Sequence, residues 1–458
     1  MLDDMLDYVS QIRQRPVWQP APDSVEHVFR SSIPSASKSL RETHECFMQS
    51  VLPYTVGNSH PGFMGWVHGG GTVVGMLAEM LASGLNSNLG GRDQIPIQVE
   101  QQVVRWMQQL FGFPESASGL FVTGSSMANF IGLLVARTSK IGTGVRAQGL
   151  QRVQQKLVAY TTCEAHSCLE RAMEMTGMGG HQLRKIPVNE LHQMNLKAFE
   201  ETIADDRALG LTPFCVIGTA GTVNVGAIDD LSGIAAVALR EDLWFHVDGA
   251  CGALGMMSTK IGAKLLGIEQ ADSIALDFHK WGQVPYDAGF VLIRNSQLHY
   301  DTFASQAEYL RRETRGMAAG SPWPCDFGPD LSRSFKALKV WFTMQVYGTD
   351  RLARMMEQTC ELATYLANRI EESAELELLA PVNLNIVCFR YRCDDADRVN
   401  AEIVVAIQES GLVAPSSTTI GGKFAIRAAI FNHRTSQLEI DSLVEESLRF
   451  GRSISQTN

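Results

Sequence analysis

Three side chains of complementary chemistry follow predicted β-strands in the middle of the chain. Lys280 lies in DFHKWG directly after an apolar run, Asp248 ends LWFHVD, and His166 lies in EAHSCLERA after KLVAYTT. The carboxyl ends of parallel strands meet at one edge of a sheet, where ligands bind in open α/β folds. The sequence therefore predicts that an amine, a carboxylate and an imidazole lie together at that edge.

This combination matches what pyridoxal 5'-phosphate requires. The cofactor takes a lysine amine for a Schiff base and an acid facing its pyridinium nitrogen, while a flat group can cover its ring. Lys280, Asp248 and His166 would fill these roles. The phosphate favours a helix N-terminus, where backbone N–H groups and the helix dipole attract an anion. Ser125 and Ser126, in the strand-to-helix turn of TGSSMANF, would supply that site.

Each motif alone also has a purely structural interpretation. A strand-end aspartate is commonly a capping group, a lone histidine is commonly a core or surface side chain, and Gly-Ser-Ser before a helix is common capping chemistry. The occurrence of all of them in one chain, in this order, favours a cofactor site.

From residue 119 onward the chain alternates between strand and helix patterns. Short β-branched runs separated by helical stretches predict a mostly parallel sheet covered by helices on both faces. Strands are expected at 119–124, 156–162, 214–221, 243–250, 272–278 and 288–294, and helices precede them at 73–85 and 97–113.

The pattern along the chain predicts three domains. Residues 1–85 form a helical N-terminal arm, since prolines interrupt its short helical stretches. Residues 86–345 form the large cofactor-binding α/β domain. Residues 346–458 form a small α+β C-terminal domain, for which the sequence indicates helices at 336–348 and 350–372 and strands at 385–392 and 423–432.

Composition excludes several classes of protein. The 458 residues include 45% apolar and 19% charged side chains, as in ordinary folded domains, and the net charge is −10. An acidic chain without a basic cluster indicates neither nucleic-acid binding nor membrane-surface binding. No apolar run is long enough for a transmembrane helix, and the acidic N-terminus is unlike a secretory signal.

The remaining motifs point to a cytoplasmic protein without a metal site. The nine cysteines are scattered without a C-x-x-C pair, which indicates a reducing compartment. His60 and His68 have no further ligands at metal-binding spacing. The chain contains neither a P-loop motif nor a strand-linked G-x-G-x-x-G, so nucleotide binding is not expected.

Taken together, these strings resemble the group II pyridoxal-phosphate amino-acid decarboxylases of fold type I, which include aromatic-L-amino-acid and glutamate decarboxylases. The resemblance implies a large domain with a mostly parallel seven-stranded sheet between helices. It rests on the strings HPGFMGW, TGSSMAN, AHSCLERA, GTAGTVNVGAIDDL, WFHVDGACGA, SIALDFHKW, EYL, RSFKALKVWF and FAIRAAIFNHRT, which follow one another in family order.

The resemblance implies roles for the residues at the strand ends. Lys280 is implied as the Schiff-base lysine, with His279 beside it helping to hold the phosphate. Asp248 is implied to pair with the pyridinium nitrogen, and Ala250 to pack against the ring. His166 is implied to stack on the ring near the substrate carboxylate.

Other roles implied by the resemblance fall on loops. Thr222 is implied to lie near the cofactor ring, and Ser125 and Ser126 to bind the phosphate. Ser332 aligns with a position from which a partner subunit reaches toward the phosphate. Tyr309 matches a loop tyrosine that returns a proton after CO₂ leaves, whereas relatives with Phe there resemble aldehyde synthases. Tyrosine at this position favours an amine product.

Two positions require a separate interpretation. Asp277 stands where relatives often have Asn, and an anion would repel a phosphate. We therefore expect Asp277 either to point away from the phosphate, for example to a backbone donor, or to be protonated, and we do not assign it to phosphate binding. Arg427 is expected to be structural or a weak carboxylate contact, because tight binding of a leaving carboxylate would stabilise the ground state.

The residues expected around the substrate give conflicting indications. Trp66 and His68, followed by a glycine run, leave space for an aromatic ring. Asn86 and Asn88 resemble a string of glutamate-type decarboxylases, and Arg92 could meet an acidic side chain. Tight turns and core packing would explain the same residues. The prediction favours an aromatic L-amino acid.

Four hypotheses for function follow. The first is decarboxylation of an aromatic L-amino acid to its amine and CO₂. The second is decarboxylation of an acidic or polar amino acid of the glutamate, aspartate, cysteine sulfinate or diaminobutyrate type. The third is a fold-type-I aminotransferase or aldehyde synthase, and the fourth is an inactive scaffold, against which the intact set of site residues argues. The resemblance also implies a homodimer with its active site at the interface.

Overall fold

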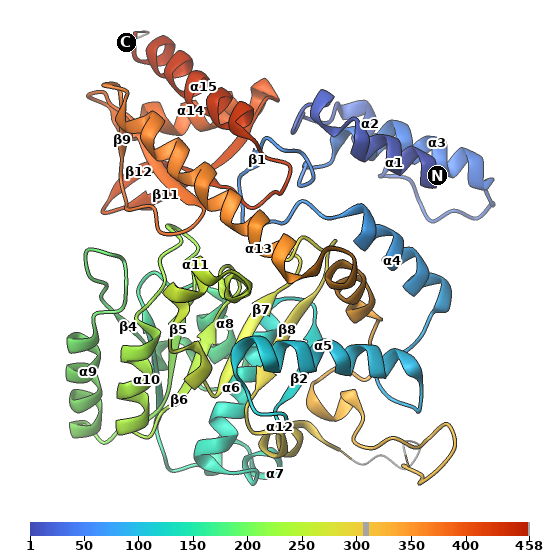
Figure 1. The fold of residues 1–458 in the computed structure, drawn as a ribbon, viewed down its shortest axis with the longest axis vertical. Coiled ribbons are helices and arrows are strands. Elements are labelled where there is room, and N and C mark those ends of the chain that lie inside the picture. The colour runs from blue at the N-terminus through green and yellow to red at the C-terminus, as the bar shows by residue number, and fades with distance from the viewer. Residues whose placement is uncertain (306–310, 457–458) are drawn as a thin grey trace. The chain divides into compact units, whose positions relative to one another are not determined.

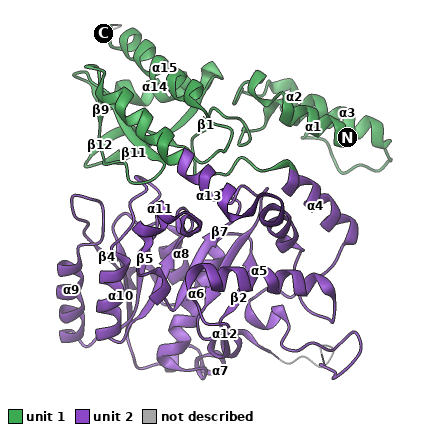
Figure 2. Ribbon diagram, in the orientation of Figure 1, with its two compact units in different colours: residues 1–73, 359–458 green, residues 74–358 purple. Residues whose placement is uncertain are grey.

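The computed structural model describes residues 1–305 and 311–456. It contains two compact units (Figure 2), one joining residues 1–73 to 359–458 and the other containing residues 74–358. Each unit has its own sheet. The domain boundaries expected at residues 85 and 345 remain predictions.

The larger unit is built on a seven-stranded sheet in the order β2-β8-β7-β6-β5-β3-β4 (Figure 1). Its strands are β2 (Ser118–Val122), β3 (Leu157–Thr162), β4 (Leu183–Ile186), β5 (Thr212–Thr219), β6 (Trp244–Asp248), β7 (Ser273–Asp277) and β8 (Gly289–Ile293). Adjacent strands are parallel from β7 to β4, and β8 runs antiparallel to both β7 and β2. The predicted α/β fold with a mostly parallel seven-stranded sheet is confirmed.

Helices cover both faces of this sheet, with α6 and α10 among them. The helices of this unit before α13 are α4 (Val73–Leu85), α5 (Ile95–Phe111), α6 (Ser125–Ile141), α7 (Val145–Gln148), α8 (Cys168–Met175), α9 (Leu196–Ala208), α10 (Leu231–Arg240), α11 (Thr259–Gly262) and α12 (Ser296–Phe303). Successive residues of β6 face different helices. His246 bonds to Asn129 of α6, whereas Phe245 lies with Leu231 of α10 around Gly218. This alternation is the period of two expected of a strand that is buried on both faces.

Strand β4 is the strand of this sheet that the sequence did not locate. Its four residues carry two cations, Arg184 and Lys185, so the apolar pattern is short. It pairs with β3 alone, at the edge of the sheet. Arg184 bonds to the buried carboxylate of Asp206 on α9, which accommodates a charge on this strand. Charged, short edge strands are common and give a weak sequence signal.

The smaller unit contains a five-stranded sheet in the order β1-β11-β12-β10-β9. Its strands are β1 (Phe63–Met64), β9 (Leu376–Leu378), β10 (Ile386–Tyr391), β11 (Ala414–Ile420) and β12 (Lys423–Ala429). The helices α14 (Ala396–Ser410) and α15 (Gln437–Gln456) complete its core, in which Phe389, Ile403 and Leu443 are fully buried. Because β1 pairs with β11, residues near 63 join a sheet made by the C-terminal part of the chain.

The first fifty residues contain α1 (Leu2–Ser10), α2 (Asp23–Val28) and α3 (Leu40–Ser50). None of the residues in these three helices is buried. The side chains of these helices are exposed or half-buried. The N-terminal arm of residues 1–85 remains a prediction.

Helix α13 (Lys336–Glu371) is interrupted at Gly348, whose φ of 68° and ψ of 163° are not helical. This confirms the prediction of two successive helices, and glycine supplies the backbone conformation that the break requires. Among the described residues, no helix combines the length and the apolar character needed to cross a membrane.

Candidate active site

The predicted site residues follow four neighbouring parallel strands of the large sheet. His166 follows β3, Thr222 follows β5, Asp248 ends β6 and Lys280 lies three residues after β7. Asp248 is in register with Thr219 of β5 and with Ala275 of β7. The strand ends therefore bring the amine, carboxylate and imidazole to one edge, as the spacing predicted.

Lys280 forms an ion pair with Asp277, which ends β7. The Lys280 Nζ lies 2.8 Å from the Asp277 Oδ2. Burial disfavours the ammonium, but the adjacent carboxylate outweighs this effect and raises the pKa of Lys280 above its usual range. In this structure Lys280 is therefore a cation held by a carboxylate.

Asp277 also contacts the turn that begins α6. Its Oδ1 accepts a hydrogen bond from the backbone N–H of Ser125 at 2.7 Å, and its Oδ1 lies 3.7 Å from the Nε2 of His279. Burial opposes ionisation, but Lys280 and His279 outweigh it and lower the pKa of Asp277. The expectation that Asp277 points away from the phosphate site is therefore wrong, because the backbone donor that it contacts is Ser125 of the proposed phosphate-binding turn. The lowered pKa also argues against the protonated alternative.

His279 is oriented by its own loop. Its Nδ1 accepts a hydrogen bond from the backbone N–H of Ala288 at 3.0 Å, and its ring lies 4.3 Å from that of Tyr286. Burial lowers the pKa of His279, so the neutral ring with its proton on Nε2 is favoured. That N–H points to the side of the loop where Asp277 and Gly124 lie.

Asp248 is a buried carboxylate beside the pair. One of its oxygens accepts a hydrogen bond from the backbone N–H of Ala250 at 3.2 Å. Burial raises the pKa of Asp248, while the charge of Lys280 acts in the opposite direction. A buried carboxylate is stabilised by a cation brought next to it, and a protonated pyridine nitrogen is such a cation.

His166 lies on the solvent-exposed side of the cluster. Its Nδ1 accepts a hydrogen bond from the backbone N–H of Cys168 at 3.1 Å, which fixes the ring at the start of α8. Desolvation by the surrounding protein lowers the pKa of His166, although Asp248 opposes this. The neutral imidazole is thus available to cover a flat ring.

Three predicted hydroxyl residues lie in the turn after β5 and at the start of α6, namely Thr222, Ser125 and Ser126. Thr222 is buried, and its Oγ1 accepts a hydrogen bond from the backbone N–H of Ala227, which holds the turn after β5. Ser125 is buried with its Oγ unpartnered among the described residues, whereas Ser126 is exposed. An unpartnered buried hydroxyl at a helix N-terminus is what a phosphate would satisfy.

The donor set therefore fits pyridoxal phosphate. Lys280 supplies the amine, Asp248 a buried anion, His166 a neutral flat ring and Ser125 an unpartnered hydroxyl. Among the described residues, no group of histidine, cysteine and acidic side chains could hold a metal ion.

The residues expected near the substrate in the larger unit have structural contacts. Asn86 follows α4 with a φ of 49° and is exposed. The Oδ1 of Asn88 accepts backbone hydrogen bonds from Gly90 and Arg333. The guanidinium of Arg92 lies 4.5 Å from the ring centroid of Trp323. The substrate roles of Asn86 and Asn88 remain predictions.

Trp66 and His68 belong to the smaller unit. They form an aromatic cluster with Phe63, in which the Phe63 ring lies 5.7 Å from His68 and 5.9 Å from Trp66. Trp66 is 56% exposed. In the same unit, the buried guanidinium of Arg427 donates to the carbonyl of Gly65 and to the Oγ of Ser416, which is a structural arrangement.

Two further predicted positions, Ser332 and Tyr309, are not among the residues that contact the Lys280 cluster in the described part of the chain. Ser332 is exposed, next to the buried Arg333. Tyr309 lies outside the described residues. Their roles remain predictions.

Sequence reasoning missed a buried polar chain behind the site. The Nε2 of His246 lies 2.8 Å from the Asn129 Oδ1, and the Asn129 amide donates to the Cys168 sulfur. The other ring nitrogen of His246 lies 2.7 Å from the Oγ of Ser273. The signal available was spacing, since His246 is two residues before Asp248 and shares its face of β6. This chain connects the strand of Asp248 to the helices after Ser125 and His166.

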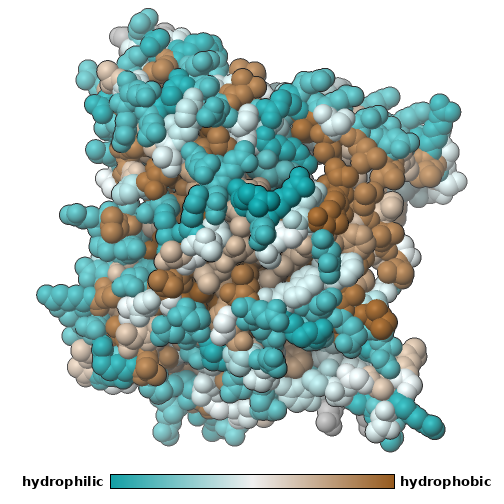
Figure 3. All heavy atoms as spheres, in the orientation of Figure 1, coloured by the Kyte–Doolittle hydropathy of each residue, from teal (hydrophilic) through white to brown (hydrophobic). Residues whose placement is uncertain are grey.

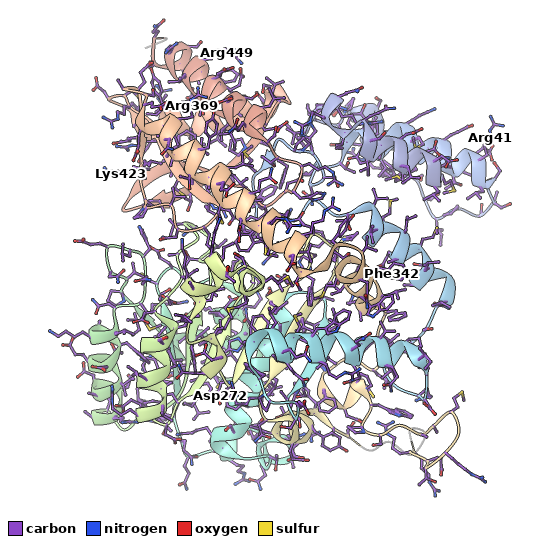
Figure 4. The ribbon with its side chains drawn as sticks, viewed as in Figure 1. Arg41, Asp272, Phe342, Arg369, Lys423 and Arg449 are labelled. Atoms are coloured by element: carbon purple, nitrogen blue, oxygen red, sulfur yellow. The ribbon has the colours of Figure 1, made fainter. Side chains whose placement is uncertain are left out.

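A separate groove of about 800 Å³ lies at the opposite ends of the strands. It is lined by residues that begin β6 and precede β7, including Trp244 and Asp272 (labelled in Figure 4). The Asp272 carboxylate accepts a hydrogen bond from the backbone of Phe245. The groove therefore lies away from the Lys280 cluster and shares no lining residue with it.

Comparison with known proteins gives a consistent picture. The sequence profile of the pyridoxal-dependent decarboxylase conserved domain matches residues 22–392. The chain is 33% identical over 466 aligned positions to an aromatic-L-amino-acid decarboxylase of Bacillus atrophaeus, covering 97% of this chain and 94% of that protein. It is 29% identical to an L-2,4-diaminobutyrate decarboxylase of Acinetobacter baumannii, covering 84% and 78% respectively.

A solved structure has the same fold. The glutamate decarboxylase domain of a diaminobutyrate-pyruvate transaminase and L-2,4-diaminobutyrate decarboxylase from Vibrio parahaemolyticus superposes with a TM-score of 0.88. The two are 26% identical, and the alignment covers 99% of this chain and 94% of that one.

Proposed function

We propose that this chain, which belongs to the pyridoxal-dependent decarboxylase family and is a pyridoxal-phosphate-dependent amino-acid decarboxylase, acts on an aromatic L-amino acid. The reaction would release CO₂ and the corresponding amine. The observation that carries this choice is the 33% identity, over nearly the whole of both chains, to a relative named as an aromatic-L-amino-acid decarboxylase. The exposed indole of Trp66 is consistent with it, because an aromatic surface can stack on an aromatic substrate.

A second candidate is a polar substrate of the diaminobutyrate type. A relative and a structural neighbour named as diaminobutyrate decarboxylases support it. For such a substrate, we assign contacts with its polar side chain to Asn86, Asn88 and Arg92.

The site residues would divide the reaction between them. When bound, pyridoxal phosphate supplies a protonated ring that accepts the electron pair of the bond broken at Cα. Asp248 would hold the proton on the ring nitrogen, because its buried carboxylate favours an adjacent cation. Lys280 would hold the cofactor covalently, and Ser125, Ser126 and His279 would bind its phosphate.

On the substrate, the Cα–carboxylate bond must be oriented for cleavage, and Cα must receive one proton after CO₂ leaves. His166 would lie over the ring and keep the carboxylate out of its plane, so that the Cα–carboxylate bond is the one that breaks. A proton must then replace CO₂ at Cα. We assign that donation to the phenol of Tyr309, on the resemblance alone, with Thr222 and Ala250 shaping the floor of the site.

The experiment that tests the proposal is a substrate panel on the purified protein. L-tyrosine, L-tryptophan, L-phenylalanine, L-DOPA, L-glutamate, L-aspartate, cysteine sulfinate and L-2,4-diaminobutyrate would be compared by CO₂ release and by amine identification. An aromatic amine at the highest kcat/KM supports the proposal. Preference for diaminobutyrate or an acidic substrate would replace it with the second candidate, and aldehyde or keto acid formation would replace the decarboxylation itself.

We also infer a homodimer. Helices α1, α2 and α3 bury none of their residues, and α4 exposes Met80, Leu81 and Leu85. Figure 3 shows this apolar surface over α4. Amphipathic faces of this kind need a covering partner. Ser332 would then reach toward the phosphate of the partner subunit. Light scattering of the purified protein tests this, and a monomer at micromolar concentration would contradict it.

A reducing, cytoplasmic location completes the proposal. All nine cysteines are free of disulfide bonds, and four of them are buried. Fractionation of the source cells would test the location.

A further inference from the structure

Asp277 binds both the amine of Lys280 and the backbone N–H of Ser125, the two groups assigned above to the attachment of pyridoxal phosphate and to its phosphate. One carboxylate oxygen bonds to the backbone N–H of Ser125, the first residue of α6, and the other pairs with the ammonium of Lys280. The carboxylate is 3% exposed, so solvent does not screen these contacts. A buried acid therefore bridges the attachment amine and the phosphate-binding turn.

We propose that Asp277 controls the rate at which this protein takes up pyridoxal phosphate, by holding Lys280 as an ammonium and by occupying the first N–H of α6. The proposal rests on the assignment of Lys280 as the attachment lysine. Asp277 is a positioning residue in this scheme, because it acts through Lys280 and the Ser125 turn.

The chemistry of attachment explains why the ion pair is slow to load. The ammonium must first release one proton to solvent, because an ammonium has no lone pair. The neutral amine then bonds to the aldehyde carbon, the carbon–oxygen double bond breaks, and the oxygen leaves as water with the two amine protons. Each unit by which the lysine pKa is raised lowers the reactive fraction about tenfold at neutral pH.

Other charged or titratable groups around the pair do not replace Asp277. Its removal would leave a buried lysine whose desolvation favours the neutral amine. The other titratable groups around the pair are Asp248 at the end of β6, Cys251 in the turn after β6, His166 before α8, and His279 and Tyr286 in the loop after β7. Cys251 and Asp248 also raise the pKa of Lys280, and each contributes less than Asp277.

The test is the loading rate of the full chain after removal of its cofactor with hydroxylamine. Pyridoxal phosphate is added at a series of pH values, and the absorbance of the lysine-bound form is followed with time. The Asp277→Asn variant keeps an acceptor for the Ser125 N–H but removes the charge. We expect it to load at least about tenfold faster than the wild type at neutral pH, with a rate that levels off at lower pH.

A matched control uses Asp272, a half-buried acid that immediately precedes the same strand. Asp272→Asn removes a carboxylate that bonds to the Phe245 backbone at the opposite end of β7. It should load as the wild type does. Loading of Asp277→Asn at the wild-type rate, or more slowly, would overturn the inference.

Borohydride reduction of both proteins, followed by peptide mapping, separates this inference from the proposed function. An adduct on Lys280 with unchanged loading rates overturns only the role of Asp277. An adduct on another residue, or none, overturns the assignment of Lys280 itself.

A second measurement needs no variant. Acetic anhydride labelling of Lys280 in the cofactor-free wild type is followed with pH and compared with that of Nα-acetyl-lysine amide, a free lysine amine. We expect labelling of Lys280 to keep rising at pH values where that of the free amine levels off. A Lys280 curve that levels off at the same pH, or lower, would contradict the inference.

Discussion

Gly289 at the start of β8 lies directly against Gly124, the residue before α6. A Cβ atom added to Gly289 would lie 2.3 Å from the Cα of Gly124. Both residues border the turn that carries Ser125, so β8 sets the position of the proposed phosphate site from behind. The close approach requires glycine at residue 289 because no other side chain leaves the two backbones in contact.

Gly289→Ala should displace this turn. We expect a loss of about 1–3 kcal/mol in the free energy of unfolding, as for overpacked sites, and weaker binding of pyridoxal phosphate. Urea unfolding and a cofactor titration measure the two effects. Gly144→Ala is the matched control, because its added Cβ meets open space and its φ of −56° suits alanine. Equal behaviour of the two variants would contradict the packing argument.

Lys280→Ala should abolish turnover, because no other amine would replace the one held by Asp277. The truncation also leaves the buried Asp277 without its cation, so we expect a loss of about 3–5 kcal/mol of unfolding free energy. Amine formation and urea unfolding measure the two effects. Turnover at the wild-type level would remove Lys280 from the mechanism.

Tyr309→Phe should change the product rather than stop the reaction. Without a phenolic proton donor we expect less amine and more aldehyde, because Cα is then protonated more slowly and is open to oxidation by dissolved O₂, which yields the aldehyde, ammonia and hydrogen peroxide. Chromatography of both products from one incubation measures the ratio. Tyr8→Phe, in the N-terminal arm, is a control that should leave it unchanged. The same ratio in Tyr309→Phe as in the wild type would exclude the assigned role.

The buried ion pair of Arg333 and Glu100 should be more important for stability than any surface pair. Their side chains are 4% and 1% exposed, and Arg333 also donates to the carbonyls of Leu89 and Phe121. Glu100→Gln should cost about 3–5 kcal/mol of unfolding free energy, because it leaves a buried guanidinium without its counter-ion. Glu45→Gln, in the exposed pair with Arg41, should cost about 1 kcal/mol or less. Similar losses in the two variants would contradict this ranking.

Buried histidines should make the protein less stable as the pH falls. Burial lowers the pKa of His299, next to Ser118, from 6.5 to about 3. The unfolded chain then binds a proton below pH 6.5 that the folded chain does not, so stability is complete above pH 6.5 and is lost as the pH falls toward 3. The loss is about 1.4 kcal/mol per pH unit for this one group.

His299→Asn should therefore reduce the fall in unfolding free energy between pH 6.5 and 5 by about 2 kcal/mol. Urea unfolding at the two pH values measures it. The exposed His181→Asn variant is the control and should keep the wild-type difference. His246, whose pKa burial also lowers to about 3, would account for part of the fall that remains. An unchanged difference in His299→Asn would contradict the argument.

The sequence determined which residues lie at the strand ends. Asp248 ends one short apolar run and Lys280 follows another, and the length of these runs favours buried strands. Parallel strands present their carboxyl ends at one edge. Helix α4 was predicted with the bounds that the structure has, because its apolar period is uninterrupted. These features are local, so periodicity and spacing suffice to read them.

The tertiary structure decided how the site is held. The hydrogen bond between Asp277 and Ser125 joins residues that are 152 positions apart in the sequence. No local sequence pattern predicts that the Asp277 carboxylate points to that backbone N–H. The sequence likewise did not predict the hydrogen bond between Asn88 and the backbone of Arg333, which is 245 residues away. Strand β4 exists because β3 offers an open edge, not because its own four residues demand it. Long-range contacts depend on which surfaces meet after folding, and that information lies in no single stretch of the chain.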